Sequence, residues 1–181
     1  IERMLEILGQ GTIYVYAETP PDSSLLPDSA EISPSRMLEG LVYSADAEGA
    51  AVIHAVGPDY FSGMRGRELG IIMEDQDVLN PSVVSSSFAD KLGLMAGDRM
   101  TLLLYEEESG RTRPILLTIA GIFPSVYPQL DSNILYIPLK TSGYGPDGYE
   151  VLLPPDGDAE EMERKLGASG CSFSSYMEIY S

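Results

Sequence analysis

Two single residues are the first candidates for chemistry in this chain, because His54 is its only histidine and Cys171 its only cysteine. One histidine without clustered partners makes a poor metal site or catalytic base, and alternation along Val52–Val56 places it on one face of a strand. Cys171 lies among serines with no basic neighbour that would favour its thiolate, so it is a poor nucleophile. We therefore expect both residues to be structural.

The acidic candidates are the segment Glu74-Asp-Gln-Asp77 and the pair Asp90 and Asp98. The segment could gather oxygen ligands for a hard cation, but it lacks the Asp-x-Asp-x-Asp-Gly frame and the bidentate glutamate of a calcium loop. Asp98 follows Gly97 before a strand, a position that favours side-chain bonding to turn amides. Asp90 fits the polar face of a helix. The sequence predicts no metal site and no cofactor.

Motifs for nucleotide binding and hydrolysis are absent from the sequence. It holds no Gly-x-x-x-x-Gly-Lys-Ser/Thr loop, so any ATPase must be another subunit or domain. It also lacks Gly-x-Ser-x-Gly, and a Ser-His-Asp triad could be built only around His54. A hydrolase is therefore the weakest of the functional hypotheses, and we expect no catalytic residues.

The composition restricts the partners of the chain. It has 28 acidic against 11 basic residues, a formal charge of -17, which would repel nucleic acid. The acidity favours a basic partner, although adaptation to high salt gives a similar composition. No apolar run approaches the ~18–20 residues of a membrane helix. Since the chain starts at Ile1 without a signal-like segment, we expect it to be a fragment of a longer protein.

The first half of the chain predicts short elements. A helical face over Ile1–Leu8 precedes a β-branched and aromatic strand over Thr12–Ala17. Prolines over Glu18–Ser35 favour a loop with at most a short helix. Two further strands, at Met37–Ser44 and Ala50–Val56, are expected to form a hairpin in which Gly49 can take a positive φ.

The second half is easier to interpret. Ser85 can cap a helix that runs to Leu92 and stops at Gly93. The best local helix spans Asp156–Gly167, with Asp156 or Asp158 as its cap. The expected strands are Leu69–Met73, Met100–Tyr105, Arg113–Phe123, Ile134–Ile137 and Gly148–Leu153. These elements together predict an α+β fold.

The order of elements from Val83 to Leu139 resembles a known family. A capped helix, a Gly-Asp turn, a strand, a polar hairpin, a strand closing on Gly121-Ile-Phe and a third ending in Tyr136-Ile-Pro-Leu follow one another. This order is similar to the extracytoplasmic core domain of MacB-like transporter permeases, especially the lipoprotein-releasing (Lol) and FtsX-like type. The resemblance implies one extracytoplasmic domain over 1–181, with mixed and antiparallel sheets and a few short helices.

The resemblance also implies two lobes and a place in a larger protein. A membrane-proximal lobe would combine 1–58 with 147–181, and a β-rich lobe would span 59–146. Such a domain is inserted between the first two of four membrane helices of a permease. Its two ends must return to one membrane-facing side, so Leu8 and Met177 are expected within about 10 Å of each other.

Permeases of this family work as dimers with cytoplasmic ATPase subunits, and their outer domains change posture as ATP is bound and hydrolysed. The resemblance therefore implies an ATPase subunit, a second permease subunit, and a lipoprotein or a periplasmic carrier as partners. We favour the Lol branch, because the sequences of Gly121-Ile-Phe and of the segment Gln129–Leu139 look closer to that branch than to the efflux branch. The alternatives are a MacB-type efflux permease, an FtsX-like regulatory permease, and a freestanding extracytoplasmic binding module.

A candidate surface for a partner or substrate follows the hairpin and the segment before the third strand. Its residues are Tyr105, Glu106, Glu107, Glu108, Tyr127 and Leu130. Lol-type permeases that recruit the carrier directly carry a long apolar hook at this hairpin. Here three successive carboxylates occupy it, and Gly110 suits a tight turn, so we expect no hook.

Overall fold

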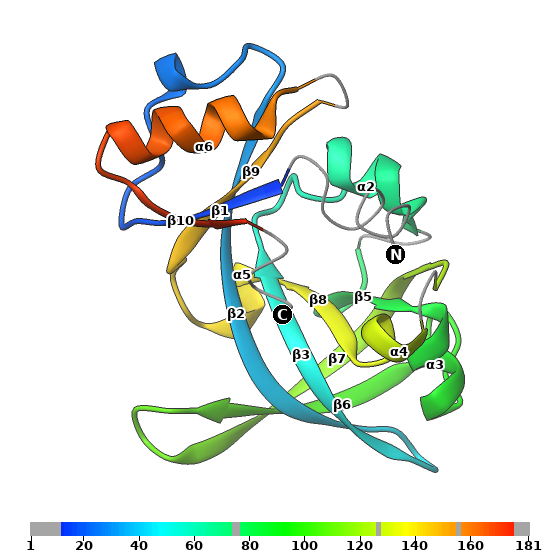
Figure 1. Ribbon diagram of the computed structural model, residues 1–181. Helices are drawn as coiled ribbons and strands as arrows, with labels where there is room; N and C mark the ends of the chain where they lie inside the picture. The colour runs from blue at the N-terminus through cyan, green and yellow to red at the C-terminus, as the bar shows by residue number, and fades with distance from the viewer. Residues whose placement is uncertain (1–11, 74–76, 126–127, 155–156, 176–181) are drawn as a thin grey trace. The chain divides into compact units, whose positions relative to one another are not determined.

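The computed structural model describes residues 12–73, 77–125, 128–154 and 157–175 (Figure 1). Its strands are β1 (Thr12–Tyr16), β2 (Glu31–Tyr43), β3 (Glu48–Val56), β4 (Ile72–Met73), β5 (Pro81–Ser85), β6 (Arg99–Glu106), β7 (Arg111–Phe123), β8 (Ile134–Pro138), β9 (Gly148–Leu152) and β10 (Ser172–Ser175). Its helices are the 3-10 turn η1 (Ser23–Leu25) and α2 (Met64–Leu69), α3 (Ser86–Leu92), α4 (Pro128–Asp131), α5 (Leu139–Ser142) and α6 (Ala159–Ala168). Hydrogen bonding joins the strands into a mixed sheet, so the α+β prediction is confirmed.

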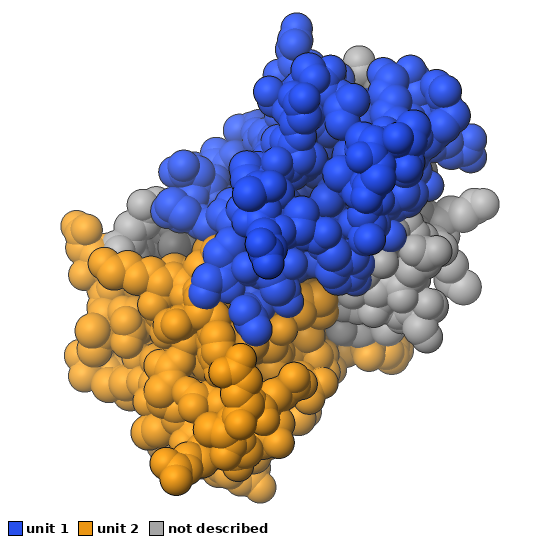
Figure 2. Space-filling model, turned by 90° about the vertical axis from the view of Figure 1, so that its left-hand side faces the viewer, with its two compact units in different colours: residues 1–36, 57–69, 145–181 blue, residues 37–56, 70–144 orange. Residues whose placement is uncertain are grey.

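The chain divides into two compact units (Figure 2). Unit 1 holds residues 1–36, 57–69 and 145–181, and unit 2 holds 37–56 and 70–144. The expected lobes differ from these units at residues 37–56, 59–69 and 145–146. Residues 37–56 belong to unit 2, because β2 pairs with β6 from Gly40 to Tyr43 and β3 pairs with β8. Residues 57–69 belong to unit 1, because the Gly57 amide donates to the Pro34 carbonyl at 3.1 Å.

Unit 1 is built on an antiparallel sheet in the order β10-β1-β9-β2. One face of this sheet is apolar and packs against α6 through Met162 and Leu166. Alternation explains the division of the faces, since Ile13 and Val15 on β1 and Val151 on β9 all point to the helix side. Asp158 caps α6 by accepting from the Glu161 amide at 3.0 Å, as expected. The helix continues through Gly167 to Ala168, so its predicted end was wrong.

The first and last described strands of unit 1 lie side by side. Ile13 of β1 is opposite Ser175 of β10, and Tyr16 is opposite Ser172. Because the pair is antiparallel, the chain enters β1 and leaves β10 at the same end of the sheet. The helix expected over Ile1–Leu8 and the distance between Leu8 and Met177 lie outside the described residues.

Unit 2 combines parallel and antiparallel pairs. β3 pairs with β8 and β5 with β7 in parallel, while β6 pairs antiparallel with both β2 and β7 (Figure 1). The core lies between this sheet and α3, whose Phe88 and Leu92 are buried among strand residues. The α3 prediction is confirmed: Ser85 accepts from the Phe88 amide at 3.1 Å, and Gly93 ends the helix at a φ of 66°.

Three local predictions were wrong. Residues Glu31–Ser35 form the start of β2 rather than a loop, because they pair with β9 and the Pro34 carbonyl finds a donor in Gly57. The strand expected over Leu69–Met73 is divided: α2 ends at Leu69, and only Ile72–Met73 is extended. The prediction of a positive φ at Gly49 was wrong, because this residue lies within β3. A Cβ added there would lie 3.5 Å from the Phe88 ring.

Gly40 allows β2 and β6 to approach each other. A Cβ at this position would lie 2.6 Å from the Leu103 carbonyl oxygen and 2.9 Å from a Leu102 methyl carbon. We expect Gly40→Val to lower the free energy of unfolding by about 2–3 kcal/mol, the upper part of the ordinary range, as measured by urea denaturation. Gly145→Ala is the control, because nothing lies within 4 Å of its added Cβ. Equal urea midpoints for both variants would contradict this account of the β2–β6 pair.

Candidate functional site

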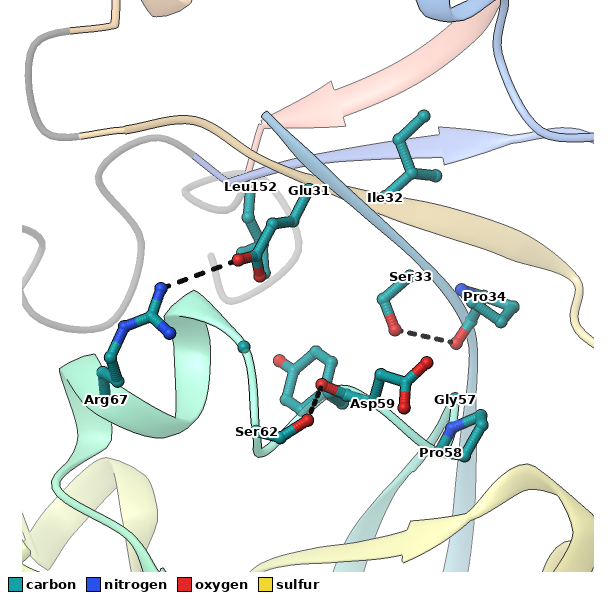
Figure 3. A pocket seen from close by; sticks show the side chains of 12 residues that line it. Glu31, Ile32, Ser33, Pro34, Gly57, Pro58, Asp59, Ser62, Arg67 and Leu152 are labelled. Carbon is teal, nitrogen blue, oxygen red and sulfur yellow. Dashed lines mark hydrogen bonds and ion pairs between the residues drawn. The ribbon is translucent and has the colours of Figure 1, made fainter. Parts of the chain in front are cut away.

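A pocket of about 420 Å³ opens in unit 1 (Figure 3). All of its lining residues belong to that unit, coming from the start of β2, the segment before α2, α2 itself and β9. The lining is mixed: Glu31, Asp59 and Arg67 bring charge, while Pro34 and Leu152 bring apolar surface. Such a mixture suits the binding of a polar group more than the burial of an apolar ligand.

Glu31 organises one wall of the pocket. Its carboxylate accepts a hydrogen bond from the Met64 amide at 2.7 Å and lies 3.7 Å from the Arg67 guanidinium (Figure 3). A Cβ on Gly63 would lie 2.4 Å from the same carboxylate, so a larger residue there would displace the Glu31 side chain. The exposed ion pair adds little stability. The hydrogen bond from the Met64 amide to Glu31 joins the start of α2 to β2.

A buried polar cluster lies on the same side of the unit 1 sheet. Glu150 stands between its two neighbouring strands, opposite Tyr14 on β1 and Ser33 on β2, so these three side chains share one face. Arg65 and Tyr60 from the segment 57–69 are buried too, and the Tyr60 hydroxyl hydrogen-bonds Glu150. Glu150 Oε2 has no hydrogen-bond partner. The cluster gives the segment a polar anchor on the sheet.

Burial raises the pKa of both acids of the cluster, Tyr14 and Glu150. It raises the pKa of Glu150, and the nearby Arg65 charge and the Tyr60 hydrogen bond offset part of that rise. Burial also raises the pKa of Tyr14, whose hydroxyl bonds Asp147, and the Asp147 carboxylate adds to the rise. Tyr14 therefore stays a neutral donor, and burial disfavours the charged form of Glu150 as well.

The predicted surface residues fall mainly on one hairpin. Tyr105 is exposed near the end of β6, and Glu107 and Glu108 are exposed in the turn. Glu106 instead accepts from Arg113 at 3.0 Å, so its charge is compensated. Tyr127 lies outside the described residues, and Leu130 is described only through the backbone of α4. The turn is tight, with Gly110 at a φ of 63°, as expected for a hairpin without a hook.

The contacts of the single histidine and of Asp98 are those of structural residues. His54 is buried, with its ring centroid 5.0 Å from that of Tyr136. Asp98 accepts from the Met95 amide at 2.9 Å, which is the turn bond that the sequence predicted. Asp90 is exposed on α3. Within the described ranges no three His, Cys, Asp or Glu residues come together as a metal site; Glu74 to Gln76 lie outside those ranges.

Sequence reasoning missed a second buried acid with hydroxyl partners. Asp131 is buried in unit 2, and its carboxylate accepts from Ser87 at 2.8 Å, while its carbonyl accepts from Ser85 at 2.7 Å. These bonds join the start of α3 to α4. The run Ser85–Ser87 was the available signal, but only its capping role was recognised. The Ser125 hydroxyl also donates to the Asp131 carboxylate, so this group links three segments of unit 2.

Comparisons with known proteins point to one family. The family described as MacB-like periplasmic core domain matches residues 5–169. The extracellular domain of the noncanonic ABC-type transporter YknZ from Gram-positive bacteria is 10% identical, with a TM-score of 0.48, covering 91% of this chain and 98% of that chain. A domain of a putative permease from Porphyromonas gingivalis is 14% identical, with a TM-score of 0.46, covering 91% and 89%. No curated protein matches.

The chain belongs to the MacB-like periplasmic core domain family, since the match spans most of its length. It is accordingly an extracytoplasmic domain of an ABC-type permease, which agrees with the expectation of a non-enzymatic role. The family implies association with an ATPase subunit and a partner permease. No helix in the described parts of the chain has the length and apolar character needed to cross a bilayer.

Glu150 gives a pH-dependent prediction. A carboxyl whose folded pKa is raised binds more protons when folded, so its contribution to stability falls as pH rises from its ordinary pKa near 4.5. We expect the free energy of unfolding of the natural protein, relative to Glu150→Gln, to fall between pH 5 and pH 8, as measured by urea denaturation. Glu160→Gln, on the exposed side of α6, is the control and should show no such trend. A difference for Glu150→Gln that stays constant with pH would contradict the assignment.

Proposed function

We propose that this domain belongs to a lipoprotein-releasing permease. In this role it couples ATP hydrolysis in a cytoplasmic subunit to the extraction or transfer of a lipoprotein outside the membrane. The full-length protein would be integral to the membrane and would pair with a second permease subunit. The sequence of Gly121-Ile-Phe and Gln129–Leu139 supports the lipoprotein-releasing branch over the efflux and regulatory branches.

The observation that carries the mechanical part of this proposal is the pairing of β1 with β10. Val15 is opposite Phe173, and the chain enters and leaves unit 1 at one end of its sheet. A domain inserted between two consecutive membrane helices needs this arrangement, because both connections must reach the same membrane surface. Movement of the two helices would then reach unit 1 through two neighbouring, hydrogen-bonded strands.

The β6–β7 hairpin supports the non-hook role within such a transporter. Its turn holds the exposed carboxylates Glu107 and Glu108 and closes at Gly110, so it offers no apolar anchor for a carrier. Carboxylates at this place could steer a basic partner over a distance that depends on salt. We infer that carrier recruitment by a hook is the task of the partner permease subunit.

Reconstitution tests the proposal. The full-length permease, its partner permease and its ATPase are placed in proteoliposomes that contain a labelled lipoprotein, with a periplasmic carrier outside. We expect ATP to release the lipoprotein to the carrier at least about tenfold faster than ADP does, with loss of release when the partner permease is omitted. If the complex hydrolyses ATP but releases nothing, and instead stimulates efflux or a wall hydrolase, the lipoprotein assignment is wrong and the permease assignment stands.

A further inference from the structure

The outward side of the β2–β6–β7 sheet in unit 2 carries apolar side chains that are not part of the hydrophobic core. Along β6, Met100, Leu102 and Leu104 are buried against α3 and the other strands, so the residues between them point the opposite way. The same alternation holds on β7, where Ile115 and Leu117 are buried. The outward residues are therefore a separate set.

The strand register places these outward residues next to one another. Leu41 of β2 is opposite Leu103 of β6, which is opposite Pro114 of β7. In the neighbouring row, Tyr43 is opposite Thr101, which is opposite Leu116. Tyr105 extends the set along β6. We call this set the outer face: Leu41, Tyr43, Leu103, Tyr105, Pro114 and Leu116.

The exposed apolar residues of the outer face are Leu41, Tyr105, Pro114 and Leu116, while Tyr43 and Leu103 are half-buried and Thr101 and Thr112 lie among them. Exposed fractions are 43% for Leu41, 45% for Tyr105 and 41% for Leu116. The solvent side of an antiparallel sheet is ordinarily polar, and large apolar side chains gathered there mark an interaction site. Both edges of β6 are occupied by β2 and β7, so an added strand cannot pair with it. A partner must dock through side chains on the face.

The charges around the outer face identify the kind of partner. The exposed acids on the flanking strands and turns outnumber the exposed bases: they are Glu39, Asp46, Glu48, Glu107 and Glu108 against Arg99 and Arg111. A second copy would bring the same acidic border, and each copy carries a net charge of -17, so the two would repel. A partner with basic residues around an apolar centre would be attracted.

We propose that the outer face docks a second protein that presents an apolar patch bordered by lysine and arginine. Leu41, Leu103 and Leu116 form the centre that loses water on docking, and Glu107 and Glu108 meet the basic border. This inference goes beyond the permease function and is independent of the branch to which the permease belongs. The docked protein would lie outside the membrane, on the same side as the domain.

Site-specific photo-crosslinking in cells that produce the full-length permease tests the proposal. The crosslinker replaces Leu41 or Leu116 in turn, and Met95, which is 70% exposed in a loop of the same unit, is the control position. We expect both outer-face positions to capture one protein, at least about tenfold above the control, through a peptide with apolar residues beside lysine or arginine. Capture of only a second copy, only lipid, an acidic peptide, or nothing above the control would overturn the proposal.

Binding of the purified captured protein to the purified transporter completes the test. We expect the affinity to fall at least about tenfold in the double variant Leu41→Ser, Leu116→Ser and in Glu107→Lys, Glu108→Lys. The matched controls are Met95→Ser and Glu160→Lys, which should leave the affinity unchanged. These are exposed positions, and a limited-proteolysis pattern of each variant transporter that matches the natural one shows that the domain is folded. If the affinity falls in the serine variant but not in the lysine variant, the proposed basic border of the partner is wrong.

Discussion

The antiparallel pairing of β1 with its two neighbours is the constraint on which unit 1 depends. β1 lies between β9 and β10, so the first described residues of the chain are hydrogen-bonded to its last ones. This closure joins strands from the two ends of the described chain. It also sets the face on which Tyr14 meets Glu150, and so the position of the buried cluster and of the pocket beside it.

The segment 57–69 is the part of unit 1 that depends most on polar contacts. It is joined to the sheet by the Gly57 amide, by the bond from the Met64 amide to Glu31, and by Arg65 and Tyr60 at Glu150. Burying the Glu150 carboxyl near the Arg65 charge costs free energy of solvation, so this contact adds little to stability. The contacts of Arg65 and Tyr60 with Glu150 join the segment to β9.

Much of the fold could be predicted from local signals. The Ser85 cap, the Gly93 stop, the Asp98 turn and the short β6–β7 hairpin are each fixed by residues a few positions apart, and all are found. The predictions failed where pairing between strands that are far apart in the sequence decides the secondary structure. Residues Glu31–Ser35 hold a proline and look like a loop, yet β9 recruits them as a strand. The buried Glu150 was not anticipated, because its partners Arg65 and Tyr60 are about 90 residues away in the sequence.

The proposed function requires that β1 and β10, the entering and leaving strands of unit 1, remain paired while the transporter works. Tyr16 and Ser172 are opposite each other on β1 and β10, at a separation that a disulfide can span. The measurement is the oxidation of Tyr16→Cys with Ser172→Cys, with Cys171→Ser, in the full-length permease complex with ATP and with ADP. We expect rapid and complete crosslinking in both nucleotide states, with ATP-coupled release unchanged by the crosslink. Crosslinking that fails, that occurs in one nucleotide state alone, or that stops release would contradict this requirement.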